Sequence, residues 1–127
     1  MSKNILIVDD AMFMRAILKE MLTKKNFTVV GDVENGRKAV EKYKELFNTS
    51  QKVDLVLMDI TMPEMDGITA LKKLKEFDEN VVVVMCSSLS SEKSVVQAIQ
   101  SGAKHFIRKP FVEEKVINTI EAVLNKK

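Results

Sequence analysis

The feature that most constrains the fold is a regular alternation of short apolar runs with segments of helical periodicity. The apolar runs lie at residues 5–8, 28–30, 53–58, 81–85 and 105–107. Each is followed by a segment whose apolar residues recur every three or four positions, as in an amphipathic helix. Short continuous apolar runs favour strands that are buried on both faces. The alternation therefore predicts an α/β domain, in which a five-stranded parallel sheet is covered on both faces by five helices.

Turn and cap residues mark where the predicted helices begin or end. Asn35-Gly36 precedes the second helix, Asp66 is a suitable N-cap for the third, and Gly102 is a suitable stop for the fourth. We find no internal repeat, low-complexity segment or linker, so we expect one domain over residues 1–127. The apolar residues that define the five helices are Phe13, Met14, Ile17, Leu18, Met21 and Leu22; Ala39, Val40, Tyr43 and Phe47; Ile68, Leu71, Leu74 and Phe77; Val95, Ala98 and Ile99; and Val116, Ile120, Val123 and Leu124.

The overall composition adds few limits on function. A net charge of +2 is too small to indicate a nucleic-acid partner, and no apolar run is long enough to span a bilayer. The N-terminal residues pass directly into the first apolar run, so we expect no signal peptide. The one cysteine, Cys86, ends an apolar run and has no second cysteine to pair with. We therefore expect a buried, reduced thiol and a cytoplasmic protein.

Polar residues follow four of the predicted strands at the point where each strand ends. They are Asp9 and Asp10 after the first strand, Asp59 after the third, Ser87 and Ser88 after the fourth, and Lys109 after the fifth. In an open parallel sheet the carboxyl ends of the strands lie at one edge, and this edge carries the functional site in folds of this class. We therefore expect these side chains to converge.

Three carboxylates held close together repel one another unless a cation joins them or one of them is protonated. Oxygen ligands with no His or Cys nearby favour Mg²⁺ over zinc. A carboxylate can also act as a nucleophile toward phosphorus and form an aspartyl phosphate. In such a site Mg²⁺ and Lys109 would neutralise charge, and the Ser87 hydroxyl would donate a hydrogen bond to a phosphoryl oxygen. The pattern indicates a phosphate-and-metal switch.

Each of these residues also has an ordinary structural explanation. Asp9-Asp10 and Ser87-Ser88 could cap the helices that follow them. Asp59 could be a loop residue before Pro63, and Lys109 could be a surface lysine. For any one residue alone the ordinary explanation is the better one. Their joint placement at successive strand ends of one sheet favours the switch.

The sequence resembles the receiver domains of two-component response regulators over essentially its whole length. The matching residues are Val8-Asp9-Asp10, the run from Met58 to Gly67 that contains Asp59 and Met62-Pro63, Ser87 with the small Ser88 after it, Gly102-Ala103, and Lys109-Pro110-Phe111. The resemblance implies a flavodoxin-like (CheY-like) fold with strand order 2-1-3-4-5. It also implies a role for each matching residue.

By this resemblance Asp59 is the phosphoacceptor. Asp10, Asp59 and the backbone carbonyl of Thr61 would bind Mg²⁺ directly, and Asp9 would act through a metal-bound water. No other cofactor is implied. The catalytic set would be Asp59 together with the lysine and the hydroxyl that follow the fifth and fourth strands.

The resemblance also implies how the phosphoryl group is sensed. Lys109 would pair with the phosphoryl group, and the Lys109-Pro110 peptide bond would be cis. Ser87 would move toward the phosphoryl group, and Phe106 would turn inward behind it; Phe106 lacks the hydroxyl of the tyrosine that is often found at this position. Thr61 and Leu89 stand where the family tunes the rate of dephosphorylation.

Within the family the resemblance is closest to the stand-alone receivers of chemotaxis, because the segment from Asp10 to Arg15 resembles their first helix and we expect no output domain. It implies a CheA-like histidine kinase, a flagellar or archaellar motor switch protein or adaptor, and a phosphatase as partners. The protein would be a monomer, and not an enzyme beyond its own phosphorylation and dephosphorylation. The implied readout face lies on the last strand and the last two helices, with exposed Ser94, Gln97, Gln100, Lys104, Arg108 and Glu114.

There are three alternatives to a receiver domain of chemotaxis. A stand-alone receiver in a phosphorelay outside chemotaxis fits the same residues and stays open. A haloacid-dehalogenase-like phosphatase is disfavoured, because that family has a second Asp two residues after its nucleophile, where this chain has Ala11 and Thr61. A flavodoxin-like FMN carrier is disfavoured because Asp9-Asp10 would repel a phosphate at the first strand end unless a metal intervened.

Overall fold

The computed structural model describes residues 2–60, 65–88 and 92–125, apart from the side chains of Glu92 and Ser94, and within them strands and helices alternate as predicted. The elements are β1 (Asn4–Val8), α1 (Met12–Lys24), β2 (Thr28–Val33), α2 (Gly36–Leu46), β3 (Leu55–Asp59), α3 (Gly67–Phe77), β4 (Val83–Ser87), α4 (Glu92–Gln100), β5 (His105–Arg108) and α5 (Glu113–Leu124). The predicted α/β class is confirmed.

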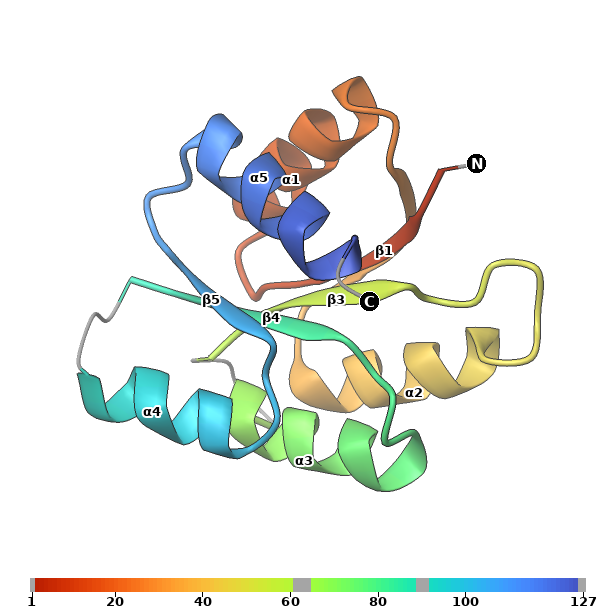
Figure 1. Ribbon diagram of the computed structural model, residues 1–127. Helices are drawn as coiled ribbons and strands as arrows, with labels where there is room; N and C mark the ends of the chain where they lie inside the picture. Colours follow the sequence, from red (N-terminus) through yellow and green to blue (C-terminus); the bar gives the residue numbers. More distant parts are fainter. Residues whose placement is uncertain (1, 61–64, 89–91, 126–127) are drawn as a thin grey trace.

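The five strands form one parallel sheet in the order β2-β1-β3-β4-β5. This order confirms the flavodoxin-like arrangement that the resemblance implied, with β3 in the centre and β5 at an edge. Helices α1 and α5 cover one face of the sheet, and α2, α3 and α4 cover the other (Figure 1). Strands β1 and β3 are parallel neighbours, so their carboxyl ends lie side by side. The strand order also reverses between them, and ligands bind at such a point in sheets of this class.

Alternating residues of the inner strands belong to two separate hydrophobic cores, one on each face of the sheet. In β1, Ile5 and Ile7 pack toward α1 and α5, whereas Leu6 and Val8 pack on the opposite side. This is the period of two that a strand imposes on its side chains. Because both faces are covered, every residue of β3 and β4 is buried, including the terminal Asp59 and Ser87.

The helix ends follow the signals in the sequence. The Asn35 side chain accepts a hydrogen bond from the Lys38 N–H at 2.8 Å, and the Asp66 side chain accepts one from the Thr69 N–H at 2.8 Å. Both are N-caps, so they begin α2 and α3 where predicted. Gly102 follows α4 with φ at 112°, a left-handed conformation that glycine adopts without strain.

The apolar stripe of α1 is wider than the face that the sheet covers. Leu18 and Leu22 are buried, but Phe13 and Ile17 are 66% and 41% exposed. Ile99 in α4 and Phe77 in α3 are likewise 46% and 40% exposed. These four residues were expected to belong to the packed faces of their helices, and that expectation is wrong. Helical spacing identifies an apolar stripe, but not how much of it a neighbouring element covers.

The structure also bears on the expectations for Cys86 and for membrane-spanning segments. Cys86 is 2% exposed and its burial raises the pKa of its thiol, so the sulfur is a packed apolar group as predicted. Among the described residues, none of the helices has the length and apolar character that a membrane crossing requires.

Candidate functional site

The carboxyl ends of β1 and β3 bring three carboxylates together. Val8 pairs with Met58 in the parallel ladder, so the next residues of the two strands, Asp9 and Asp59, are neighbours. One carboxylate oxygen from each of Asp9, Asp10 and Asp59 lies within 4.8 Å of the others. Asp9 and Asp59 are only 1% and 6% exposed, whereas Asp10 is exposed. The predicted acidic cluster is therefore formed.

Lys109 reaches the same place from the end of β5. Its Nζ lies 2.8 Å from Oδ2 of Asp9 and 3.4 Å from Oδ2 of Asp59. Burial alone would lower the pKa of Lys109, but the hydrogen bond to Asp9 and the charges of Asp59 and Asp9 raise it above its ordinary value. The lysine is thus a fixed positive charge between two carboxylates.

A backbone hydrogen bond to the last residue of β4 holds this lysine in place. The Lys109 N–H donates to the Ser87 carbonyl at 2.9 Å. The Lys109-Pro110 peptide bond is cis, as the resemblance implied. Ser87 itself is 2% exposed and, by the register of β3 and β4, stands one residue beyond the partner of Asp59. The hydroxyl-bearing residue therefore lies at the same edge of the sheet as the acidic cluster.

Backbone hydrogen bonds on both sides hold the residue that follows Asp59. The Ile60 N–H donates to the Cys86 carbonyl at 3.0 Å, and the Gly67 N–H donates to the Ile60 carbonyl at 2.7 Å. Burial raises the pKa of the Asp59 carboxyl above its ordinary value; Lys109 opposes this effect, and Asp9 and Asp10 add to it. The ionised Asp59 is therefore poorly compensated by the protein alone.

The chemistry of this cluster suits a hard divalent cation. Three carboxylates face one lysine, so their ionised forms leave an excess of negative charge at the site. The described donors are all oxygen atoms, which favour Mg²⁺ or a similar ion over zinc. Such an ion would offset the burial of the Asp59 charge, which is the main cause of its raised pKa, and the repulsion from Asp9 and Asp10 that adds to it.

The other predicted residues lie in the loops and on the surface around this cluster. Thr61 and Leu89 lie outside the described residues, and so does the side chain of Ser94. Phe106 is partly buried and packs against the core on the α2, α3 and α4 side. The remaining residues of the predicted readout face are exposed, namely Gln97, Gln100, Lys104, Arg108 and Glu114.

Sequence reasoning did not single out the contacts of Arg15. Its Nη1 donates to the backbone carbonyl of Asp9 at 2.7 Å, and its Nε lies 3.2 Å from Oδ2 of Asp32. The sequence does place Arg15 one helical turn after Ala11, the residue at the N-cap of α1. This spacing puts its side chain on the same side of the helix as the loop that carries Asp9. Spacing alone does not tell which backbone atom a guanidinium will reach.

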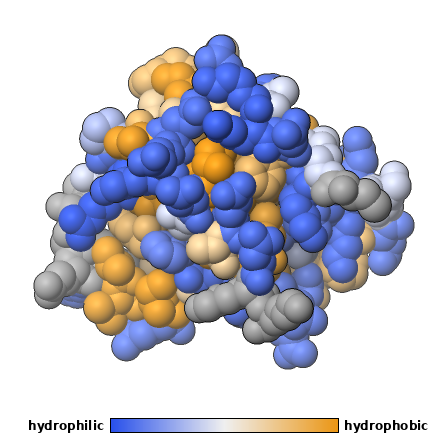
Figure 2. All heavy atoms as spheres, turned by 45° about the horizontal axis from the view of Figure 1, so that its top comes forward, coloured by the Kyte–Doolittle hydropathy of each residue, from blue (hydrophilic) through white to orange (hydrophobic). Residues whose placement is uncertain are grey.

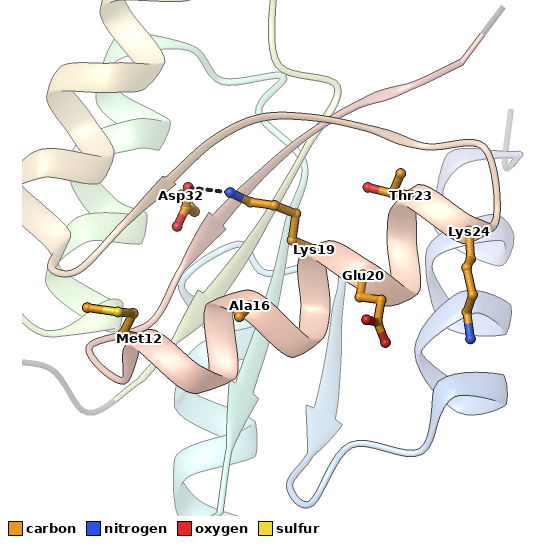
Figure 3. Close-up of a pocket in the computed structure, with 7 residues that line it drawn as sticks. All are labelled: Met12, Ala16, Lys19, Glu20, Thr23, Lys24 and Asp32. Atoms are coloured by element: carbon orange, nitrogen blue, oxygen red, sulfur yellow. Dashed lines mark ion pairs between the residues drawn. The ribbon is translucent and has the colours of Figure 1, made fainter.

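A groove of about 550 Å³ lies elsewhere, along α1 and the adjacent β2. Its lining includes Met12, Lys19, Glu20 and Asp32, and none of the three clustered carboxylates (Figure 3). The face that carries α1 and α5 is mainly hydrophilic, with hydrophobic side chains in smaller groups (Figure 2). The acidic cluster at the edge of the sheet is therefore separate from this groove.

The raised pKa of Asp59 gives a prediction about stability and pH. A pKa that is higher in the folded than in the unfolded protein contributes stability below the unfolded value of about 4, and this stability is lost as the pH rises through the folded value. Without divalent cations, we therefore expect Asp59→Asn to become increasingly more stable than the wild type between pH 4 and pH 7.

This effect is measured by urea unfolding in a chelating buffer at several pH values. Glu79→Gln, which changes an exposed carboxylate before β4, is the matched control and should track the wild type. A stability difference between Asp59→Asn and the wild type that does not change with pH would show that the Asp59 charge is already compensated.

Comparison with known proteins agrees with this geometry. Residues 5–121 match the family described as Response regulator receiver domain. The chain is 53% identical over 125 residues to the protein named Chemotaxis protein CheY of Bacillus subtilis (98% of this chain, 100% of the relative). It is 49% identical over 123 residues to the protein of the same name from Thermotoga maritima (97% and 98%).

A solved structure has nearly the same fold. It is the CheX-CheY-BeF3-Mg complex from Borrelia burgdorferi, which matches with a TM-score of 0.92 and 40% sequence identity. The match covers 98% of this chain and 90% of that chain.

Proposed function

This chain belongs to the response regulator receiver domain family, and we propose that Asp59 is the residue on which it accepts a phosphoryl group. The protein is a chemotaxis response regulator of the CheY kind, to judge from identity of about half over the full length of its relatives. It is a signalling protein rather than an enzyme. We propose that residues 1–127 act as a single receiver domain.

One observation supports this proposal above the others. A buried carboxylate at the end of the central strand lies beside two further carboxylates and within 3.4 Å of the Nζ of Lys109. A cap or an ordinary surface ion pair does not need three acids and a partly buried lysine at one point. The arrangement is suited to transfer of a phosphoryl group, which requires positioning and charge neutralisation more than acid–base chemistry.

The proposed metal is Mg²⁺. Asp10, Asp59 and the backbone carbonyl of Thr61 would hold it directly, and Asp9 would hold it through water. When bound, Mg²⁺ supplies neutralisation of the charge on the phosphoryl oxygens. The donor set of the described residues fits this ion, because it consists of oxygen atoms alone.

In the proposed reaction an oxygen of the Asp59 carboxylate attacks the phosphorus of a phosphohistidine. The new P–O bond forms as the P–N bond breaks, and the electron pair of that bond stays on the histidine nitrogen of the donor. Lys109, already 3.4 Å from Asp59, pairs with a phosphoryl oxygen. The Ser87 hydroxyl donates a hydrogen bond to another. Water later attacks the same phosphorus and releases inorganic phosphate from Asp59.

The phosphoryl group then biases an equilibrium between two conformations. It adds negative charge and acceptor oxygens that Lys109 and Ser87 can engage. Movement of Ser87 toward the phosphoryl group would let Phe106 turn further inward, and this changes the surface of α4, β5 and α5. We propose this surface, with exposed Gln97, Lys104 and Arg108, as the readout face.

The proposed partners follow from the relatives. We propose a CheA-like histidine kinase as the phosphodonor, and a motor switch protein or an adaptor as the output partner. A CheY structure with the same fold is in complex with CheX, so we propose a partner of that kind as well, in the role of a phosphatase. We propose that the chain acts as a monomer in the cytoplasm.

The proposal is tested by phosphotransfer from a CheA-like kinase that has been labelled with ³²P on its histidine. We expect the label to move from the kinase to this chain within seconds when Mg²⁺ is present, and far more slowly in a chelating buffer. If several such kinases keep their label while this chain is folded and Mg²⁺ is present, the proposed function is contradicted.

Mg²⁺ should also stabilise the folded protein, because the unfolded chain does not hold the three carboxylates together. At a Mg²⁺ concentration 100 times its Kd the gain is about 2.7 kcal/mol. We expect urea unfolding to show this gain for the wild type and for Glu79→Gln, and much less of it for Asp10→Asn. Equal stabilisation of Asp10→Asn and the wild type would show that Mg²⁺ binds elsewhere.

A further inference from the structure

The backbone and side chain of Asp9 are held by four separate partners. The Asp9 N–H donates to the Val33 carbonyl at 3.1 Å, which continues the ladder between β1 and β2. Oδ1 accepts from the Ala11 N–H at 2.9 Å, and Oδ2 accepts from Lys109 at 2.8 Å. The fourth partner is Arg15, which donates to the Asp9 carbonyl at 2.7 Å. With these contacts Asp9 has no polar group without a partner.

Arg15 is itself fixed from two directions. Its side chain is 13% exposed, and its Nε lies 3.2 Å from Oδ2 of Asp32 in β2. The second oxygen of Asp32 is engaged by Lys19 at 3.2 Å, an ion pair that Figure 3 shows at the edge of the groove along α1. The guanidinium therefore links α1, the end of β1 and β2 through two of its nitrogens.

The contact between Arg15 and the Asp9 carbonyl affects the orientation of the acidic pair Asp9-Asp10. The Asp9 carbonyl belongs to the peptide group that joins Asp9 to Asp10, so a donor that fixes this carbonyl fixes the orientation of that peptide plane. The plane in turn sets where the Asp9 and Asp10 side chains project relative to Asp59. Groups that orient the side chains of a metal site typically change its metal affinity by about 10- to 100-fold when they are mutated.

We propose that Arg15 is a positioning residue for the metal and phosphoryl site. It holds the peptide plane between Asp9 and Asp10 so that both carboxylates face Asp59. This inference rests on the proposed function, since it assumes that the three carboxylates bind Mg²⁺. Arg15 touches neither the metal nor the phosphoryl group in this role.

Arginine suits this role better than lysine. The guanidinium presents several N–H groups in a rigid plane, so Nη1 and Nε can serve the Asp9 carbonyl and Asp32 together. A lysine ammonium is a point charge on a flexible stem and can serve one of these groups well. Arg15→Lys should therefore preserve the charge and lose part of the positioning.

The test measures the Mg²⁺ Kd of the wild type and of Arg15→Met, Arg15→Lys and Lys19→Met by isothermal titration calorimetry. We expect a Kd about tenfold weaker for Arg15→Met and a smaller loss for Arg15→Lys. Lys19→Met removes a half-exposed partner of Asp32 and leaves the contact between Arg15 and Asp9. It is the matched control and should bind Mg²⁺ within twofold of the wild type.

A second readout uses the metal-free protein. Amide hydrogen exchange reports the Ala11 N–H, whose acceptor is the Asp9 side chain. We expect its exchange to be at least several-fold faster in Arg15→Met than in Lys19→Met at equal global stability. A purely structural contribution of Arg15 would lower global stability and leave both the Mg²⁺ Kd and this local exchange unchanged in the folded protein.

The outcomes separate this inference from the proposed function. If the wild type binds no Mg²⁺, the proposed function fails. If the wild type binds Mg²⁺ and Arg15→Met binds it within twofold, the positioning role alone is overturned. Should Arg15→Met not fold, Arg15→Lys and Asp32→Asn decide: a Kd unchanged in both overturns the inference, and a weakened Kd in both supports it.

Discussion

Replacing Asp59 by Asn is expected to abolish specific phosphorylation of this protein. An amide oxygen is a far weaker nucleophile than a carboxylate, and the substitution also removes one of the three carboxylates that would hold Mg²⁺. Asp9 is an unsuitable substitute, since its two oxygens are engaged by Ala11 and Lys109. The expected change is therefore a complete loss at the detection limit rather than a slower rate.

The measurement follows incorporation of ³²P from a labelled small phosphodonor such as acetyl phosphate. Asp10→Asn is the informative comparison, because it removes a carboxylate from the same cluster and leaves the proposed acceptor in place. We expect this variant to be slower than the wild type but still to reach one phosphoryl group per chain at high Mg²⁺. Incorporation into Asp59→Asn at the wild-type rate would rule out Asp59 as the acceptor.

Replacing Gly67 by Ala should have the largest effect of any single methyl group in this region. A Cβ at Gly67 would meet the backbone oxygen of Asp59, and it would lie 2.8 Å from the Ile60 Cα and 2.9 Å from the Met85 Cε. Two of these three atoms belong to the backbone that carries the proposed acceptor, so they cannot move aside without moving Asp59. We expect a loss of about 2 kcal/mol in the free energy of unfolding.

The clash should also be visible in function, because the start of α3 and the end of β3 must separate to admit the methyl group. We expect phosphorylation of folded Gly67→Ala to be slower than that of the wild type. Gly31→Ala is the control: its Cβ would contact a side-chain methyl of Leu6 at 3.2 Å and the flexible Lys42 side chain. Urea unfolding should place Gly31→Ala within about 0.5 kcal/mol of the wild type. Equal stability of Gly67→Ala and Gly31→Ala would contradict the close packing against Asp59.

Much of the fold could be predicted because its determinants are local. Period and length separate strands from helices, and Asn35 and Asp66 mark helix starts by a hydrogen bond to a residue three positions later. The convergence of Asp9 and Asp59 also follows from sequence, once the strands are known to be parallel. Their register is then set by which residues are buried.

Tertiary features were less accessible to sequence analysis. Phe13 and Ile17 have the spacing of core residues but remain exposed, because coverage depends on where α5 and the sheet lie relative to α1. The contact between Arg15 and the Asp9 carbonyl joins a side chain to a backbone atom. Every residue has a backbone carbonyl, so the sequence does not show which one a side chain will bind. The same holds for Gly67, because its close contact is with the backbone of Asp59 and Ile60.

The role of Asp59 as phosphoacceptor is tested most directly by identifying the phosphorylated residue in the wild-type chain. The protein is phosphorylated by a small phosphodonor with Mg²⁺ and then reduced with borohydride, which converts an aspartyl phosphate into homoserine. Peptide mass spectrometry then locates the modified residue. We expect homoserine at position 59 alone, and only when Mg²⁺ was present. Homoserine at position 9 or 10, or none at any position in the folded protein, would contradict this role of Asp59.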